Sequence, residues 1–226
     1  MVTGRTVMQE SESREMYLKS IYELATNGDL VPVSLLANRM GISPVSASEM
    51  VKRLEEHGLI EHTPYKGLAL TGSGLHRALI VVRRQRLWGR FLADHLNIRW
   101  SQVYDMSCRL EHATDEEATE ALADFLGHPG SCPHGHPIPT AEGKVANQPV
   151  TPLNEVDFEK KVKVVRINQP ELTLCEHLEE KGIFPGTNLV IVDEAPYNGP
   201  YTLLLEGEEI SLGREISSRV MVQPAK

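Results

Sequence analysis

The sequence predicts an α+β protein with three structured parts: a winged helix-turn-helix, a second helical region and a small β-barrel. Apolar residues recur at helical spacing from residue 14 to about residue 125, with one break that has the pattern of a short hairpin. Six prolines without helical periodicity follow, and short strand-like segments separated by turn residues fill the remainder. We therefore expect domains at residues 1–73, 74–140 and 159–226, with residues 141–158 as a linker.

The first two predicted helices are short and amphipathic. In residues 14–26 the apolar positions recur on one face, at Leu18, Ile21, Tyr22 and Ala25. Residues 34–40 predict a second helix, in which Ser34 is the candidate cap before the apolar residues Leu35, Leu36, Ala37 and Met40. Gly41 and Ile42 then form a turn.

The third predicted helix begins at a strong start signal. Ser43 has the residue type of an N-cap, and Pro44 stands at the first helical position, where its missing N–H costs nothing. One face is expected to be buried, at Ala47, Met50, Val51 and Leu54. The opposite face is expected to be exposed, at Ser46, Glu49, Lys52 and Arg53.

A short hairpin follows the third helix. Residues 58–61 end the helix and begin a strand, Tyr65-Lys66-Gly67 supplies a turn, and residues 68–71 return. The alternative is an ordinary helical hairpin with a β-turn beside it. The order helix, turn, helix and hairpin, with Lys66 at the hairpin tip, favours a winged helix-turn-helix that binds DNA.

The second helical region extends from Gly74 to about Phe125. Its apolar stripe is either an intradomain core or a dimer interface, and it comprises Trp88, Phe91, Leu92 and Leu96. Helix-turn-helix proteins usually bind two-fold operators as dimers, which favours the interface. Five nearby arginines lie well past the reading helix, so we expect them to be solvated or salt-bridged: Arg77, Arg83, Arg84, Arg86 and Arg90.

The C-terminal region has the pattern of a small barrel. One helix is expected at residues 173–180. Strands are expected at residues 161–167, 188–194, 201–206, 209–212 and 220–222, separated by turn residues such as Pro185-Gly186 and Glu206-Gly207.

The net charge of -8 is distributed unevenly. Residues 1–100 contain 13 Lys and Arg against 10 Asp and Glu, whereas residues 101–226 contain 10 against 21. Phosphate contacts supply much of the electrostatic attraction to DNA, so this distribution fits DNA binding by the N-terminal part alone. Neither a membrane span nor a signal-peptide core is visible, and we expect a cytoplasmic protein whose three cysteines are reduced.

One cluster of residues suggests a metal site. Cys108, Glu111 and His112 stand at positions i, i+3 and i+4, which share one face of a helix. A thiolate, a carboxylate and an imidazole suit a transition metal, with a fourth ligand from elsewhere in the chain. The alternative is that Glu111 and His112 are exposed residues of an amphipathic helix.

The whole chain resembles the iron-dependent repressors related to the diphtheria toxin repressor. The resemblance rests on motifs in the right order: Glu15-Met16-Tyr17-Leu18, Cys108-Arg109-Leu110-Glu111-His112, Gly135-His136-Pro137-Ile138-Pro139, Gly182-Ile183-Phe184-Pro185-Gly186 and Ile210-Ser211-Leu212-Gly213. The last two resemble the SH3-like domain that these repressors share with a ferrous-iron transport accessory protein. The C-terminal barrel is therefore expected to be SH3-like.

The resemblance implies a regulatory metal site formed by Met16, Cys108, Glu111 and His112. In the family, metal favours a shape of the N-terminal helix that is compatible with DNA, and it supports a homodimer on a palindromic operator. Metal affinity and DNA affinity must then be coupled reciprocally. Thioether and thiolate ligands suit softer ions than manganese, whose sensors in the family have oxygen ligands at positions 16 and 108. We therefore expect Fe²⁺, with activation by Co²⁺, Ni²⁺ or Zn²⁺ in vitro.

The family's second, ancillary metal site is expected to be missing. Its usual histidine, glutamate and histidine positions are Gln85, Gly89 and Tyr104 here, which predicts one tight metal per subunit. Two other clusters are weaker candidates: Cys132 with His134 and His136, and Cys175-Glu176-His177, whose consecutive side chains diverge on a helix.

Residues matching the family's DNA contacts are Ser43, Ser46, Ser48 and Arg53, with Lys66 on the wing. Serine discriminates bases poorly, so phosphate contacts and DNA shape are expected to supply much of the specificity. Glu49 either accepts from a cytosine amino group or faces solvent.

Three other functions compete with an iron-dependent repressor. One is a manganese- or zinc-responsive regulator of the same family, and another is a DNA-binding protein that needs no metal. The third is a metalloenzyme that uses the face of Cys108, Glu111 and His112. Against an enzyme, we find no partnered nucleophile and base and no phosphate-binding loop.

Overall fold

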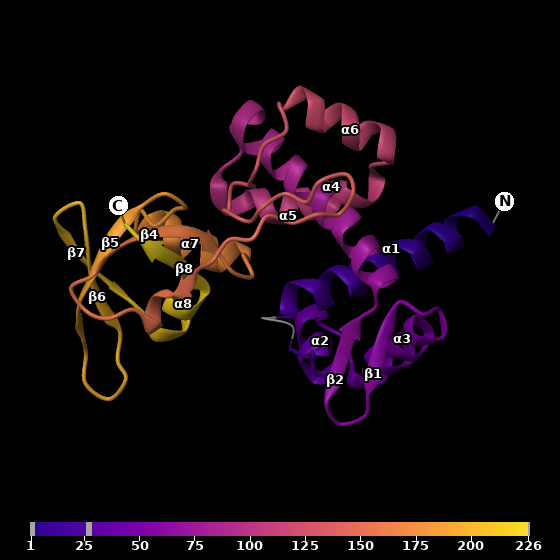
Figure 1. Ribbon diagram of the computed structural model, residues 1–226, viewed down its shortest axis with the longest axis horizontal. Coiled ribbons are helices and arrows are strands. Elements are labelled where there is room, and N and C mark those ends of the chain that lie inside the picture. The colour runs from indigo at the N-terminus through magenta and orange to yellow at the C-terminus, as the bar shows by residue number, and fades with distance from the viewer. Residues whose placement is uncertain (1–2, 26–28, 226) are drawn as a thin grey trace. The chain divides into compact units, whose positions relative to one another are not determined.

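A computed structural model describes residues 3–25 and 29–225 and divides into two compact units (Figure 1). The first comprises the chain up to Arg83 together with Pro139–Lys144, and the second comprises Arg84–Ile138 and Val145–Lys226. The division falls inside one continuous helix, α4 (Gly72–Leu96), because Ala78 in its first half packs into the core of the first unit.

The first unit begins with helices α1 (Thr3–Leu24) and α2 (Val33–Met40). Helix α1 starts earlier than the apolar pattern indicated, and Thr26, the last residue of the predicted helix, lies outside the described residues. The expectation that Ser34 caps α2 is wrong. Pro32 occupies the N-cap position without a capping side-chain hydrogen bond, and the helix has already begun at Val33.

Helix α3 (Pro44–Glu56) starts as its sequence predicts. The Ser43 hydroxyl accepts a hydrogen bond from the backbone N–H of Ser46 at 3.1 Å, which satisfies one of the free donors at the helix start. Ala47, Val51 and Leu54 are buried, as expected, whereas Met50 is only partly buried. The four residues predicted for the opposite face are all exposed.

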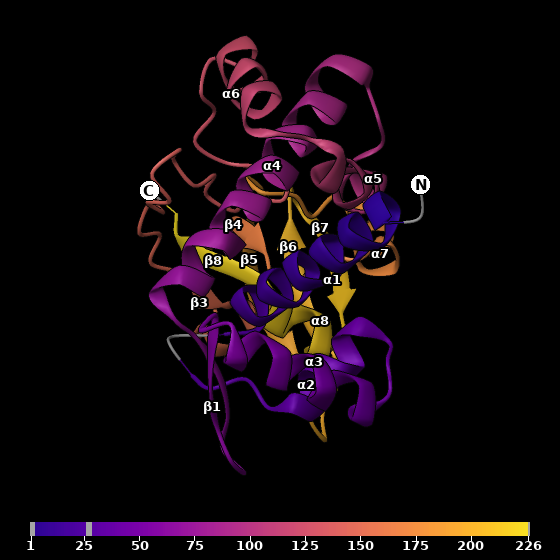
Figure 2. The same cartoon turned by 90° about the vertical axis from the view of Figure 1, so that its right-hand side faces the viewer.

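Strands β1 (Ile60–Thr63) and β2 (Gly67–Leu70) form the predicted antiparallel hairpin. Its closed end projects beyond helices α2 and α3 in both views (Figures 1 and 2). Val31 forms an isolated antiparallel bridge with Leu68 of β2, so the segment before α2 pairs with the edge of the wing. The first unit therefore has the helix–turn–helix–hairpin order of a winged helix, built on a core that includes Leu18, Leu36 and Leu54.

The second unit starts with the remainder of α4 and continues with α5 (Trp100–Leu110), the 3₁₀ turn η1 (Glu111–Ala113) and α6 (Glu116–Phe125). The Asp115 side chain accepts a hydrogen bond from the backbone of Ala118 and starts α6. Leu87 on α4 and Ala123 on α6 share a small buried cluster, which holds these helices together (Figure 1).

Two of the arginines expected to be solvated or salt-bridged are instead buried. In the first unit, Arg83 donates to the carbonyl oxygen of Pro139 at 2.9 Å. In the second unit, Arg86 donates to the carbonyl oxygen of Pro137 at 2.5 Å. Proline-rich segments leave carbonyl groups without secondary-structure partners, and these guanidinium groups satisfy them.

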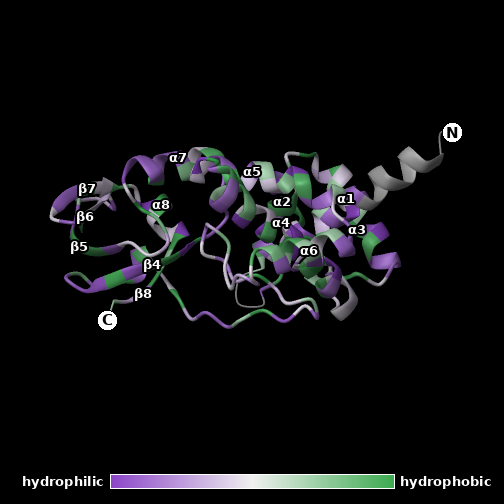
Figure 3. Ribbon diagram, turned by 90° about the horizontal axis from the view of Figure 1, so that it is seen from above, coloured by the Kyte–Doolittle hydropathy of each residue, from purple (hydrophilic) through white to green (hydrophobic). Residues whose placement is uncertain are grey.

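The C-terminal part is a six-stranded antiparallel sheet with the order β3-β8-β4-β5-β6-β7. The strands are β3 (Thr151–Pro152), β4 (Lys161–Ile167), β5 (Asn188–Glu194), β6 (Tyr201–Leu205), β7 (Glu208–Leu212) and β8 (Val220–Pro224). Apolar residues (green in Figure 3) recur along β4, β5 and β8 and form the core of this part with α7 (Leu172–Glu180). Register shifts in β4 against β8 and in β5 against β6 bend the sheet.

Three elements of the C-terminal part were not predicted. Strand β3 and the 3₁₀ turn η2 (Leu153–Glu155) lie within the predicted linker, and Leu153 is fully buried in the core of the sheet. Helix α8 (Arg214–Arg219) connects β7 to β8. Across the described ranges, no helix is long and apolar enough to cross a membrane.

Candidate metal centre and DNA-reading surface

Glu111 and His112 form the best-defined part of the predicted metal site. The Glu111 side chain is fully buried, and its Oε1 lies 3.2 Å from Nε2 of His112, whose side chain is 14% exposed. A buried carboxylate is costly unless positive charge or hydrogen bonds compensate it. The pair therefore offers a carboxylate oxygen and an imidazole nitrogen at one point, and both are good ligands for a divalent transition metal.

The sequence spacing suggested that Cys108, Glu111 and His112 share one continuous α-helix. In the structure, Cys108 lies on α5 and the other two residues do not. Helix α5 ends at Leu110, and Glu111 and His112 belong to the 3₁₀ turn that follows. The thiol of Cys108 is free of disulfides and partly exposed. Within residues 3–25 and 29–225, no three His, Cys, Asp or Glu side chains are gathered as a ready metal site.

Met16, the fourth predicted ligand, lies on α1 in the first compact unit and is partly buried. The other three predicted ligands lie in the second unit. The four residues predicted as ligands carry two sulfur atoms, one carboxylate and one imidazole, donor types that suit a borderline or soft transition metal.

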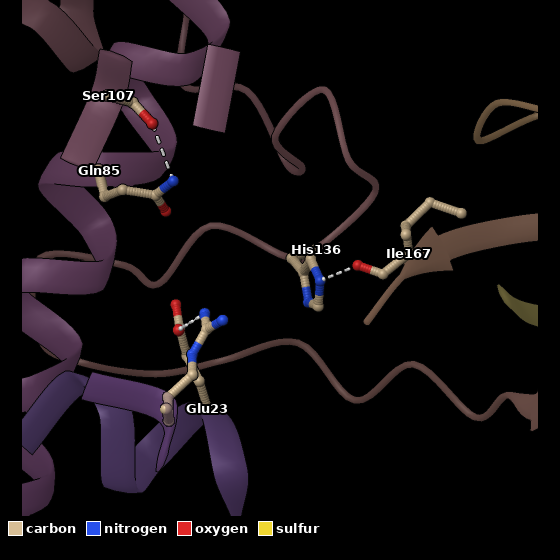
Figure 4. A network of polar contacts seen from close by, with 6 residues as sticks. Glu23, Gln85, Ser107, His136 and Ile167 are labelled. Atoms are coloured by element: carbon tan, nitrogen blue, oxygen red, sulfur yellow. Dashed lines mark hydrogen bonds and ion pairs between the residues drawn. The ribbon is translucent and has the colours of Figure 1, made fainter. Parts of the chain in front are cut away.

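Gln85, Gly89 and Tyr104, where the ancillary ligands are expected to be missing, all lie in the second unit. The Gln85 amide is buried and donates to the Ser107 hydroxyl at 2.9 Å, as Figure 4 shows. Gly89 is buried, and a Cβ there would lie 3.4 Å from Val103 and 3.5 Å from Pro133. The ring of Tyr104 lies 6.2 Å from that of His134, edge to face. These residues serve the packing of the second unit.

Residues 132–136 form a tight turn that attaches to the sheet. The backbone N–H of Gly135 donates to Cys132, and the backbone N–H of Ile167 donates to His134. Nε2 of His136 lies 2.8 Å from the carbonyl oxygen of Ile167 (Figure 4). Burial raises the pKa of the Cys132 thiol. The hydrogen bonds with Ile167 attach the turn to the end of β4.

His134 lies at the centre of this turn and is 2% exposed. Its ring stacks at a tilt on Trp100, with centroids 4.8 Å apart, and within the described part of the chain Nε2 has no hydrogen-bond partner. Burial lowers the pKa of His134 to about 4. The imidazole is therefore neutral at pH 7.

This burial predicts an acid-sensitive second unit. The unfolded chain takes up a proton on His134 near pH 6.5 and the folded chain only near pH 4, so His134 destabilises the fold progressively as the pH falls between these values. The loss amounts to about 3 kcal/mol at the acid end. The variant His134→Phe keeps a ring against Trp100. We expect its free energy of unfolding to fall by about 3 kcal/mol less than that of the wild type as the pH is lowered from 6.5 to 4. His177→Phe is the control, and equal slopes for both variants would contradict the prediction.

Cys175-Glu176-His177 lies on α7, as predicted. Cys175 is fully buried, and burial raises its pKa to about 12. It has the surroundings of a small core residue.

On the reading helix, the serines already take part in local hydrogen bonds. The Ser43 and Ser46 hydroxyls lie 2.9 Å apart, and the Ser48 hydroxyl donates to the carbonyl oxygen of Pro44 at 2.8 Å. The apolar side chain of Val45 lies beside them and is 69% exposed. Only polar residues were predicted as DNA contacts from the sequence, and Val45 was not among them. A surface hollow on this helix is lined by Pro44, Val45, Ser48, Glu49 and Lys52.

Three family models together match most of the chain. The model for the iron dependent repressor N-terminal DNA binding domain matches residues 10–68, that for the iron dependent repressor metal binding and dimerisation domain matches residues 71–140, and that for the FeoA domain matches residues 151–224. The chain is also 30% identical to a protein named diphtheria toxin repressor from Corynebacterium glutamicum, over 94% of this chain and 96% of that protein. The chain belongs to the iron-dependent repressor family.

Other relatives agree with this assignment. The iron-dependent repressor IdeR of Mycobacterium leprae is 29% identical over 94% of this chain and 97% of its own length. A solved structure titled as a manganese-dependent transcriptional repressor in complex with manganese has a TM-score of 0.87 and 30% identity, covering 94% of this chain and 100% of that one. The chain is thus a metal-dependent transcriptional repressor with DNA-binding, dimerisation and SH3-like parts, and not an enzyme.

This repressor carries an aromatic face on the second part of α4 and on α6. The Phe91 ring contacts Trp88, His95 and Phe125, with ring centroids between 5.5 and 5.8 Å apart. Phe125 is 62% exposed. Leu92 is buried, Trp88 and Phe91 are partly buried, and Leu96 is exposed, so only part of the predicted stripe belongs to the core.

Proposed function

We propose that this repressor senses Fe²⁺ through Met16, Cys108, Glu111 and His112. The observation that supports the site is the buried carboxylate of Glu111 at 3.2 Å from the His112 imidazole, one turn beyond Cys108. An oxygen and a nitrogen donor side by side suit a divalent transition metal. Two of the four proposed ligands are therefore adjacent in the fold.

The choice of Fe²⁺ rests on the two sulfur ligands. Manganese prefers carboxylate and carbonyl oxygen, whereas a thioether and a thiolate suit softer divalent ions. A manganese-responsive repressor is the second candidate, because a similar solved structure is titled as a manganese-dependent repressor. With Gln85, Gly89 and Tyr104 engaged in packing, we predict one tight metal per subunit.

The chain's own residues couple metal to DNA in this proposal. Met16 lies on α1, whose residues Leu18 and Ile21 belong to the same core as the reading helix α3. A metal that takes Met16 as a ligand therefore favours one arrangement of the winged helix. By reciprocity, operator DNA must raise the affinity for metal by the same factor.

Operator reading is proposed for the exposed face of α3 and for the wing. Ser43, Ser46, Ser48 and Arg53 are exposed there, with Lys66 on the wing. Val45 is apolar and exposed, which suits contact with a thymine methyl group, and the carboxylate of Glu49 suits a cytosine amino group. The remaining polar residues fix the position of the helix on phosphates.

The proposal is tested by operator binding under anaerobic conditions. Purified protein is stripped with a chelator, and DNA affinity is measured with Fe²⁺, Mn²⁺, Co²⁺, Ni²⁺ or Zn²⁺ at equal free concentrations. Fe²⁺ is expected to activate at lower concentration than Mn²⁺. Better activation by Mn²⁺ would replace the first candidate by the second, and metal-independent binding would exclude both.

The family assignment indicates a homodimer, and we propose the aromatic face of α4 and α6 as its contact. Phe125→Glu places a charge in this face, which should raise the dimer dissociation constant about 100-fold, because a desolvated aromatic anchor is lost and a charge is buried. Analytical ultracentrifugation measures the change. Phe158→Glu is the control, since Phe158 is 50% exposed outside this face. Equal dissociation constants for the two variants would locate the dimer contact elsewhere.

A further inference from the structure

The N-terminal end of helix α5 is held by the SH3-like part of the second unit. Oε2 of Glu179, on α7, accepts a hydrogen bond from the Ser101 hydroxyl at 2.7 Å and one from Arg99 at 3.0 Å. Ser101 is fully buried, and the Glu179 side chain is 21% exposed. Since Arg99 is 63% exposed, its ion pair contributes little, and the contact between Ser101 and Glu179 is the stronger of the two.

The position of Glu179 suits the charge at this helix end. Arg99 occupies the N-cap of α5 and makes no capping side-chain hydrogen bond. Nor does the first turn of α5 contain an acidic residue. The N-terminal end of a helix carries a partial positive charge, so a carboxylate from another element stabilises it. Glu179 supplies that carboxylate from α7.

Trp100, the first residue of α5, makes the apolar half of the same contact. It packs against the core of the sheet, and its ring lies 5.0 Å from that of Phe184. Its indole N–H donates to the carbonyl oxygen of Pro133 at 2.9 Å. Pro133 belongs to the turn 132–136 that is hydrogen-bonded to Ile167 at the end of β4. The SH3-like part therefore contacts α5 through two polar groups and one aromatic residue.

We infer that Glu179 joins the SH3-like part to α5 without a metal ion and thereby steadies the helix that carries Cys108. We call the contacts of Arg99, Ser101 and Glu179 the α5–α7 joint. Helix α5 has only eleven residues, so fixing its first turn limits fraying along its length. This inference rests on the proposed function only where it links the joint to metal affinity. The joint itself consists of contacts between side chains of this chain alone.

The joint is tested by amide hydrogen exchange on the full chain in excess chelator. Glu179→Gln keeps the shape and an acceptor but removes the charge, and it should speed exchange in the first two turns of α5 about ten-fold. Glu180→Gln is the matched control, because it removes the same charge from an exposed neighbour on α7. Unchanged exchange in Glu179→Gln would overturn the inference.

A second variant guards against a general loss of stability. Ser101→Ala removes the 2.7 Å hydrogen bond while leaving the carboxylate in place. In a double-mutant cycle, Ser101→Ala and Glu179→Gln should be non-additive, because both act on the same hydrogen bond: the first removes its donor and the second takes the charge from its acceptor. Additive effects would show that the two residues act separately and would overturn the joint as defined.

The link to metal is measured by titration with Fe²⁺ or Co²⁺. Glu179→Gln is expected to weaken metal binding about five-fold, whereas Glu180→Gln leaves it unchanged. Equal affinity in both would refute the coupling between the joint and the metal site. Cys108→Ala in the same titration separates the two hypotheses: if it binds metal as tightly as the wild type, the proposed metal site has failed, and the exchange result still decides the joint.

Discussion

Replacing Cys108 with alanine is expected to weaken metal-dependent operator binding by about 100-fold at a fixed concentration of free Fe²⁺. Alanine removes the thiolate while preserving helix propensity at the end of α5. Met16, Glu111 and His112 remain as three ligands, but the site loses its only thiolate, the softest and only anionic sulfur donor of the proposed set. The measurement is a fluorescence-anisotropy titration of operator DNA in an anaerobic chamber.

The comparison needs a variant that perturbs α5 without touching the proposed ligands. Gln102→Ala serves, since Gln102 is exposed near the other end of the same helix. It is expected to bind metal and operator as the wild type does. If Cys108→Ala also behaves as the wild type, Cys108 is not a ligand and the argument from sulfur to iron fails.

The same protein samples give the number of metals per subunit. Isothermal titration of the wild type is expected to show one tight metal, because the Gln85 amide is hydrogen-bonded to Ser107 and Gly89 has no side chain that could be a ligand. Two tight metals per subunit would show that other residues replace the usual ancillary ligands.

Sequence patterns predicted those parts of the fold that local chemistry determines. Ser43 and Pro44 marked the start of the reading helix because capping and ring geometry act over a few residues. Strands β4 and β5 have the bounds that alternation and flanking turns indicated. In the same way, the hairpin between Ile60 and Leu70 followed from its turn residues.

Features that depend on partners distant in the sequence were not predicted. Arg86 had the pattern of a solvated residue, and its burial follows from the free carbonyl of Pro137, 51 residues later. Strand β3 has only two residues and exists because β8 pairs with it. The change from α-helix to 3₁₀ turn at Glu111 was not predicted either, since the spacing of Cys108, Glu111 and His112 suggested one continuous helix.

The motif Gly135-His136-Pro137 supported the family resemblance, but the sequence did not show why a glycine stands at its start. The structure shows the reason. Gly135 has φ +86, and a Cβ at this position would lie 2.0 Å from the carbonyl oxygen of Val165 on β4. The close approach lets Ile167 donate to His134 and lets His136 contact Ile167. Only glycine combines this backbone conformation with this proximity to the sheet.

Gly135→Ala is therefore expected to lower the free energy of unfolding of the second unit by about 3 kcal/mol or more, from the strained φ and the clash with backbone atoms. Urea unfolding followed by tryptophan fluorescence reports the change, since Trp100 stacks on His134 beside this turn. Gly130→Ala is the matched control, because no atom lies within 4 Å of a Cβ there and its φ is ordinary. It should change stability by less than about 1 kcal/mol. A small effect of Gly135→Ala would mean that the turn can move away from β4 at little cost, and the attachment of the SH3-like part would then rest mainly on Trp100 and Glu179.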